Sequence, residues 1–315
     1  MKYNSIVLLG PTASGKTSLA VRLAYNFNLE IISADSRQVY KGLDLGSGKD
    51  LDEYNYSGKN IPYHLIDVTD LNSEYNVFDF TKDFYRAFKN ITGRNIIPLI
   101  AGGTGMYLDA VIRKYELVEV PENPEFHQNL LSKPLEELSK LLLSLKPDLH
   151  NKTDLEDKAR VIKAIEIASY MQSDEYLKNK EELLKRPDIQ PLILGTSLER
   201  PLLRENIKKR LDERFAQGMI EEVENLHKQG FSYERMERLG LEYRFISEYL
   251  EGKITSKEEL SEKLYTAICQ FAKRQETWFR GMERKGVKIN WLTKENSQDL
   301  KFNEAEKIIK ATFGI

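Results

Sequence analysis

Residues 10–17, GPTASGKT, constrain the fold of this chain more than any other feature. They fit the pattern G-x-x-x-x-G-K-[ST], follow an apolar run at residues 5–9, and precede a helical pattern over 17–27. A glycine-rich turn between a strand and a helix lets backbone amides approach phosphate oxygens, and the helix N-terminus adds a favourable dipole. The sequence therefore predicts a phosphate-binding loop formed by Gly10, Pro11, Thr12, Ala13, Ser14, Gly15, Lys16 and Thr17.

Two side chains of this loop have chemistry of their own. Lys16 supplies a mobile positive charge, and the hydroxyl of Thr17 is placed to ligate Mg²⁺. The pattern predicts that a phosphate compound binds and does not say which one.

Alternating strand and helix patterns in the first third of the chain predict the fold class. Short apolar runs occur at residues 30–34, 63–67 and 96–101, a helical pattern covers 78–89, and a late run occurs at 191–195. A β-α-β order with strands rich in Val, Ile and Leu favours a parallel sheet covered by helices. We therefore expect an α/β protein with a P-loop parallel sheet flanked by helices.

The strand pattern disappears over residues 116–188, a stretch rich in Leu, Lys and Glu with prolines near both ends. This predicts a helical insertion domain in a catalytic core formed by residues 1–115 and 189–315. After residue 197 the chain is almost wholly helical in pattern to about residue 284, with a short tail beyond, so we expect a helical C-terminal half.

Composition narrows the classes of function. The 315 residues carry a net charge of −2, so any nucleic acid must be held by a local basic face. Cys269 is the single cysteine, which excludes an internal disulfide and a zinc site built on cysteine pairs. The N-terminus enters a strand at once, and no long apolar run follows. We therefore expect a cytoplasmic protein without a membrane partner. The sequence shows no apolar stripe that would face a partner, so we also expect a monomer.

Asp35 and Thr104 each follow a predicted strand. The carboxyl ends of parallel strands line one crevice, so both side chains are expected beside the phosphate-binding loop. Asp35 can ligate magnesium through water or act as a general base, but Asp35 and Ser36 are equally good helix N-cap residues. Thr104 lies in a second glycine turn, for which a tight strand-to-helix connection is an alternative explanation.

Two arginines lie on an apolar helix face. At 100° per residue, Leu203, Ile207, Arg210 and Arg214 fall within a sector of about 60°. A buried, unpaired guanidinium is too costly, so these arginines should face phosphate or acidic groups in a cleft. An internal ion pair is the alternative.

A later helix, over residues 268–284, separates an apolar face from a basic one formed by Lys273, Thr277, Arg280 and Arg284. Such a stripe is usually a solvated surface, but it can also follow a nucleic-acid backbone. Arg160 and Lys163 form a similar pair in the predicted insertion.

Several segments together resemble the tRNA dimethylallyltransferase family. The matching segments occur in the same order from residue 10 to residue 280: the phosphate-binding loop, residues 31–42, 64–67 and 102–104, RLDER at 210–214, and KRQETWFR at 273–280. A phosphate-binding loop alone is generic, whereas this ordered set is specific.

The resemblance implies transfer of a dimethylallyl group from dimethylallyl diphosphate to N6 of adenosine 37 in tRNAs that read codons starting with U. It implies catalytic roles for Asp35, as the general base, and for Thr17, Arg214 and Thr104, with Mg²⁺ as the cofactor. The anticodon stem-loop would be held by the insertion and the basic helix. The residues implied to contact tRNA are Asp35, Ser36, Arg37, Gln38, Thr104, His127, Ala159, Arg160, Val161, Ile162, Lys163, Lys273, Arg274 and Arg280.

Two positions depart from the pattern of the family. His127 and Lys163 stand where arginine is usual, and these departures bear on tRNA selection more than on the reaction. Three alternative functions remain: an adenylate isopentenyltransferase acting on free AMP, ADP or ATP, a small-molecule P-loop kinase, and a phosphate-gated binding module.

Overall fold

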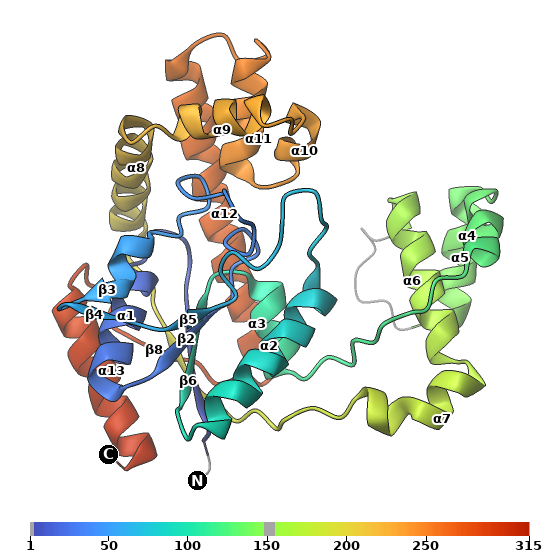
Figure 1. The fold of residues 1–315 in the computed structure, drawn as a ribbon, viewed down its shortest axis with the longest axis horizontal. Helices are drawn as coiled ribbons and strands as arrows, with labels where there is room; N and C mark the ends of the chain where they lie inside the picture. The colour runs from blue at the N-terminus through green and yellow to red at the C-terminus, as the bar shows by residue number, and fades with distance from the viewer. Residues whose placement is uncertain (1–2, 148–154, 315) are drawn as a thin grey trace. The chain divides into compact units, whose positions relative to one another are not determined.

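The computed structural model describes residues 3–147 and 155–314 (Figure 1). The chain forms two compact units. One comprises residues up to Tyr115 and from Pro187 onward, and the other is Glu116–Arg186. The sequence analysis placed the second boundary at residue 188.

A six-stranded sheet forms the centre of the first unit, with strand order β5-β2-β6-β1-β7-β8. Every neighbouring pair is parallel, which confirms the predicted α/β class. The strands are β1 (Ser5–Leu9), β2 (Glu30–Ser33), β5 (Tyr63–His64), β6 (Pro98–Gly102), β7 (Pro191–Gly195) and β8 (Asn290–Trp291).

Helices cover both faces of this sheet because successive residues of each strand point to opposite sides. Ile6 and Leu8 of β1 pack against α1 (Lys16–Phe27) and α13 (Gln298–Phe313). Val7 and Leu9 pack on the other side, against α2 (Val77–Gly93), α3 (Gly105–Ile112) and the C-terminal part of α12 (Lys257–Arg284). Figure 1 shows α1 and α13 together on one side of the sheet and α2 and α3 on the other. The carboxyl ends of the strands remain uncovered by these layers.

A second hydrophobic core lies beyond that edge of the sheet. The N-terminal part of α12 packs there with four shorter helices, so this one long helix serves both cores. The four helices are α8 (Arg200–Ala216), α9 (Met219–Lys228), α10 (Tyr233–Glu237) and α11 (Leu241–Leu250). Leu203, Ile207 and Leu211 form the buried face of α8, as the sequence pattern predicts for the first two.

The second unit is helical in its described part and has its own small core. Leu130, Leu138, Leu142 and Ile165 are among its buried residues. Its helices are α4 (Pro124–Leu131), α5 (Leu135–Leu145), α6 (Lys158–Met171) and α7 (Asp174–Leu183).

The sequence analysis missed several elements. The prediction of a short tail after residue 284 is wrong, because that segment contains β8 and the 16-residue helix α13. The strands β3 (Asn55–Tyr56) and β4 (Lys59–Asn60), which pair as a hairpin, were also not predicted. Strands of two residues carry no alternating pattern, and α13 has a lysine on its buried face, which obscures its apolar stripe.

No helix in residues 3–147 or 155–314 combines the length and the apolar character that a bilayer crossing requires.

Candidate active site

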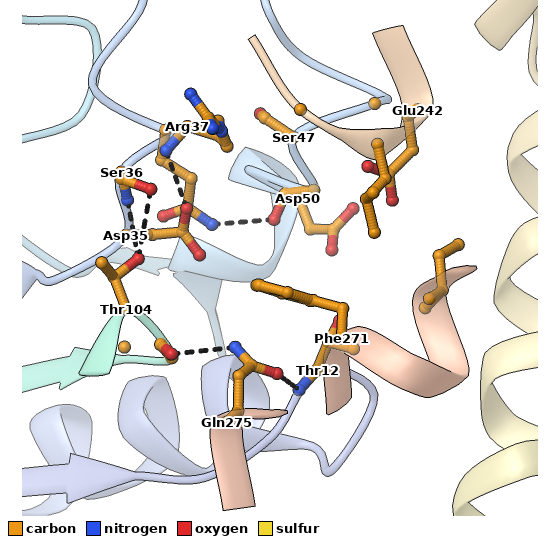
Figure 2. Close-up of a pocket in the computed structure, with 18 of the residues that line it drawn as sticks. Thr12, Asp35, Ser36, Arg37, Ser47, Asp50, Thr104, Glu242, Phe271 and Gln275 are labelled. Atoms are coloured by element: carbon orange, nitrogen blue, oxygen red, sulfur yellow. Dashed lines mark hydrogen bonds between the residues drawn. The ribbon is translucent and has the colours of Figure 1, made fainter. Parts of the chain in front are cut away.

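A cavity of about 430 Å³ opens at the carboxyl ends of the strands (Figure 2). Its walls come from segments that are distant in sequence: the phosphate-binding loop, the segments after β2 and β6, and helices α8, α11 and α12. The polar residues relevant to chemistry are Thr12, Lys16, Thr17, Asp35, Thr104, Arg210, Arg214, Glu242 and Gln275. All four predicted catalytic residues therefore line this one cavity.

The phosphate-binding loop connects β1 to α1. Gly15 precedes the helix with φ of 82°, a left-handed conformation that glycine adopts without strain. Ser14 is buried, and its hydroxyl lies 2.9 Å from the Pro11 carbonyl oxygen and 2.8 Å from Oγ1 of Thr196, which follows β7. The Lys16 ammonium donates to the Pro11 carbonyl at 2.7 Å. These hydrogen bonds tie the loop to its own backbone and to the segment after β7.

Gln275 of α12 links the phosphate-binding loop to the glycine turn after β6. Its side-chain oxygen accepts from the Thr12 amide at 2.8 Å, and its Nε2 donates to the Gly103 carbonyl at 2.8 Å (Figure 2). The sequence analysis assigned this helix face to the core and missed the link. A glutamine among apolar residues on the buried face was the available signal.

Asp35, Ser36 and Thr104 form one corner of the cavity. The Thr104 hydroxyl accepts from the Ser36 amide at 3.0 Å, and the Thr104 amide donates to the Ala34 carbonyl at 3.2 Å. At Gly102 an added Cβ would lie 2.2 Å from the Ala34 carbonyl oxygen, so the close approach of these two strand ends requires glycine.

Asp35 does not cap a helix, since the residues after it form a turn. Its Oδ1 accepts from the Arg37 amide at 2.9 Å, which is an Asx turn. The second carboxylate oxygen has no hydrogen-bond partner among the described residues, and Figure 2 shows the carboxylate at the cavity wall. The geometry thus leaves one oxygen available to a ligand.

Arg210 and Arg214 of α8 form the opposite wall. Arg210 donates to the Thr12 hydroxyl, and Arg214 forms an ion pair with Asp50 at 3.2 Å. Both alternatives from the sequence analysis therefore apply to Arg214: it faces the cavity and it has an internal acidic partner. Asp50 was not anticipated, because its proximity to Arg214 arises only in the folded chain.

The cavity holds more positive charge than its acidic residues neutralise. Burial, with Arg210 nearby, lowers the pKa of Lys16 to about 7, while Asp35 opposes this shift. Burial and the neighbouring Arg214 lower the pKa of Arg210 to about 10. Burial also raises the pKa of Glu242, while the neighbouring Arg214 and Arg210 oppose that shift. A bound polyanion would raise the pKa of Lys16 and of Arg210 again, because it favours their charged forms.

The donor groups in the cavity suit a magnesium ion shared with a phosphate ligand. Thr17 presents a hydroxyl oxygen at the start of α1, and the Asp35 carboxylate lines the same cavity with one oxygen free. No cluster of three or more His, Cys, Asp or Glu side chains able to hold a metal occurs in the described residues. Oxygen donors in small number fit Mg²⁺, which usually takes one or two protein ligands and completes its shell with phosphate and water.

The other predicted tRNA contacts in the first unit have different surroundings. Arg37 and Arg274 line the cavity, while Lys273 and Arg280 are exposed along α12. Gln38 is buried, and its side-chain amide makes hydrogen bonds within the protein. Its oxygen accepts from the Ser33 hydroxyl at 2.8 Å, and its nitrogen donates to the Gly48 carbonyl at 2.9 Å.

Two predicted tRNA contacts in the second unit need correction. Val161 and Ile162 are buried in the core of that unit, so their side chains are not available to a ligand. Helical periodicity explains this, because consecutive residues cannot all lie on one face. Ala159, Arg160 and Lys163 are exposed on α6, and His127 of α4 bonds through Nδ1 to Glu166 at 2.7 Å.

The fold and the cavity define a protein of the α/β class in which a loop of the P-loop pattern lies at a polar cavity. A family model described as "IPP transferase" matches residues 38–282, and a second, "Isopentenyl transferase", matches residues 3–61. The chain belongs to the IPP transferase family.

Relatives match over nearly their full length. "tRNA dimethylallyltransferase 2" of Treponema denticola is 57% identical over 295 residues, 93% of this chain and 97% of that one. "tRNA dimethylallyltransferase 1" of Syntrophus aciditrophicus is 49% identical over 301 residues, 96% and 97% of the two chains.

Solved structures of related proteins also match nearly the whole of this chain. The tRNA isopentenylpyrophosphate transferase of Bacillus halodurans is 29% identical with a TM-score of 0.70, and the match covers 98% of this chain and 96% of that one. A eukaryotic dimethylallyltransferase described as acting on tRNA is 25% identical with a TM-score of 0.81, covering 99% and 79%.

Proposed function

We propose that this protein transfers the dimethylallyl group of dimethylallyl diphosphate to N6 of adenosine 37 in tRNA. One observation carries the proposal: a carboxylate with a free oxygen and a phosphate-binding loop line the same cavity. In a displacement at one carbon atom, the base that takes the proton of the nucleophile and the site that holds the leaving group must lie in the same cavity. Family membership supports the choice of reaction.

The diphosphate would bind between the phosphate-binding loop and α8. Lys16, Arg210 and Arg214 supply positive charge around it, and the start of α1 contributes its backbone amides. Thr17 would hold Mg²⁺ through its hydroxyl oxygen. The bound ion supplies further positive charge to the departing oxygens.

In the proposed reaction, the N6 lone pair of adenine forms a bond to C1 of the dimethylallyl group. The bond from C1 to the bridging oxygen breaks, and its electron pair leaves with the diphosphate. The N6 proton passes to the free carboxylate oxygen of Asp35. Arg214 stabilises the charge that develops on the leaving group, and in doing so it exchanges its contact with Asp50 for the diphosphate.

The acceptor base must leave its stack to reach this cavity, because an exocyclic amine in a stacked loop is not accessible. Arg37 and Arg274 line the cavity, and we propose that they contact the backbone beside the flipped nucleotide. The exposed Arg160 and Lys163 of α6 are proposed contacts to the anticodon arm.

We propose that the protein acts in the cytoplasm as a monomer.

Incubation with labelled dimethylallyl diphosphate, Mg²⁺ and tRNA tests the proposal. The tRNA carries adenosines at positions 36, 37 and 38, and a matched tRNA carries guanosine at position 37. Label should appear in the first tRNA alone. Label in AMP without label in tRNA would instead identify an adenylate isopentenyltransferase, and ATP consumption without label transfer would identify a kinase.

A further inference from the structure

Helix α13 contacts the phosphate-binding loop but contributes no residue to the lining of the cavity, and none of the activities discussed above uses it. Lys301 is 1% exposed and donates from Nζ to the Ser14 carbonyl oxygen at 3.2 Å. Gln298 donates from Nε2 to the Gly15 carbonyl oxygen at 3.3 Å. Two consecutive carbonyl groups of the loop thus accept hydrogen bonds from one helix at the far end of the chain.

The direction of these bonds matters because the peptide group is planar and trans. No cis peptide occurs among the described residues, so the carbonyl of Ser14 and the amide of Gly15 point in opposite directions. A carbonyl held toward α13 therefore turns the following amide away from it. The Gly15 carbonyl and the Lys16 amide, which begins α1, have the same relation, although this carbonyl also accepts from the Leu19 amide at 3.2 Å.

Charge supports a role beyond packing. A buried ammonium is costly unless it is paired, and burial lowers the pKa of Lys301, a shift that no carboxylate of the described residues opposes. The uncharged Ser14 carbonyl is a weak partner for such a group. A bound phosphate would supply the missing negative charge from the other side of the same peptide group.

We infer that Lys301 and Gln298 are positioning residues of the phosphate site, which orient and polarise the Ser14–Gly15 and Gly15–Lys16 peptide groups for a bound diphosphate. A carbonyl that accepts a hydrogen bond makes the amide of its own peptide group a stronger donor. The inference rests on the proposed function only in taking a diphosphate as the ligand.

Glycine at position 15 is part of this arrangement. A Cβ added there would lie 2.0 Å from Nε2 of Gln298, so no other residue type leaves room for the contact. Gln275 contacts the loop differently, since its oxygen accepts from the Thr12 amide and removes that amide from phosphate binding. Gln275 at the cavity thus occupies one amide of the loop, whereas Lys301 and Gln298 bond only to loop carbonyl groups and leave the amides of those peptide groups for the ligand.

The test measures binding of inorganic diphosphate to the full chain by calorimetry, together with steady-state kinetics. We expect Lys301→Met to weaken diphosphate binding by about tenfold, the loss of one charge-assisted hydrogen bond. Gln298→Leu should weaken it less, by about threefold. For both variants the KM for dimethylallyl diphosphate should rise in parallel, and the KM for tRNA should stay unchanged.

Lys310→Met is the matched control, because Lys310 lies on the same helix, is exposed, and pairs with Glu306 at 3.1 Å. It should bind diphosphate like the unaltered protein. Unchanged diphosphate affinity in both test variants would overturn the inference. So would a rise in both KM values accompanied by a lower Tm, since that result describes general loss of structure.

Gln298 is half-buried at the first turn of α13, so Gln298→Leu keeps the test valid if Lys301→Met does not fold. Diphosphate binding also separates this inference from the proposed function. A protein that binds diphosphate through α13 but transfers no prenyl group would contradict the proposed function alone.

Discussion

Asp35 enters the cavity with one carboxylate oxygen occupied by the Arg37 amide and the other free. The backbone therefore fixes the orientation of the side chain and leaves one oxygen for proton transfer. Lys16 and Arg214 differ from Asp35 in that each already has a partner that a ligand must replace or supplement. These differences predict separable effects on turnover, affinity and pH dependence.

Asp35→Asn should lower kcat by roughly 10²- to 10⁴-fold, the range expected for loss of a general base. The KM for dimethylallyl diphosphate should change little, since the amide keeps the shape of the side chain and its bond to the Arg37 amide. Steady-state kinetics with saturating tRNA measures both constants. Asp52→Asn, at an exposed position nearby, is the control. A binding module would keep its function in the Asp35 variant.

Arg214→Ala should raise the KM for dimethylallyl diphosphate roughly tenfold or more and also lower kcat, because a charge-assisted contact to the leaving group is lost. Asp50→Asn separates this role from the ion pair, since it removes the partner of Arg214 and keeps the guanidinium. If Arg214 were only an ion-pair residue, the two variants would show equal kinetic losses.

Diphosphate affinity should fall as the pH rises above about 7, where the unliganded protein loses the Lys16 proton. A bound polyanion favours the charged ammonium and raises its pKa, so binding above this pH takes up a proton. The affinity then falls by up to about tenfold per pH unit, and it stays flat below the unliganded pKa. Calorimetry in buffers of different ionisation enthalpy measures the uptake. The Lys16→Met variant should lack the proton uptake at Lys16, so it measures the contribution from protonation of the diphosphate itself.

Helix α6 shows how one element divides its residues between stability and recognition. Val161 and Ile162 face the core of the second unit, while Arg160 and Lys163 are exposed. A run of five residues taken from a family motif therefore contains two side chains that support the helix and others that can reach a ligand.

Val161→Ala should destabilise the second unit by roughly 1–3 kcal/mol through the cavity that it creates. Faster hydrogen exchange of the α6 amides would report this loss. Lys163→Ala should leave exchange unchanged and raise the KM for tRNA, because its side chain is exposed and only loosely paired with Glu166 at 3.6 Å. Equal effects of the two substitutions on exchange would contradict this division.

At the scale of the whole molecule, a net charge of −2 coexists with clustered basic side chains. Arg37 and Arg274 line the cavity, and Lys273 and Arg280 extend the positive surface along α12. Affinity for a polyanionic partner then depends on local placement of charge and is sensitive to salt.

The KM for tRNA should therefore rise steeply with ionic strength. Lys273→Gln should reduce the slope of log KM against log salt concentration by about 1, the contribution of one phosphate contact. Lys310→Gln, on the distant surface of α13, should leave the slope unchanged. The slope is measured at saturating dimethylallyl diphosphate, so that donor binding does not contribute.

Local patterns in the sequence were enough to predict the parallel sheet, the phosphate-binding loop and the side chains that follow β2 and β6. These features depend on neighbours in sequence: a strand, a glycine turn and a helix start. Arg210 and Arg214 were also predictable, because two charges on an apolar stripe need a polar destination. Lys301 interrupts the stripe that it shares with the buried Ala305 and Ile309, which is why the same reasoning did not reveal α13.

Only the tertiary structure decided what surrounds the phosphate-binding loop. Thr196, Gln275, Gln298 and Lys301 lie between 180 and 290 residues away along the chain, roughly, and reach the loop through packing of the sheet and helices. Each side chain contacts the loop through one or two hydrogen bonds, and no local sequence pattern predicts these contacts. The pattern of residues 10–17 thus predicts a phosphate site by itself, whereas only the folded chain brings together the distant side chains that bond to the loop.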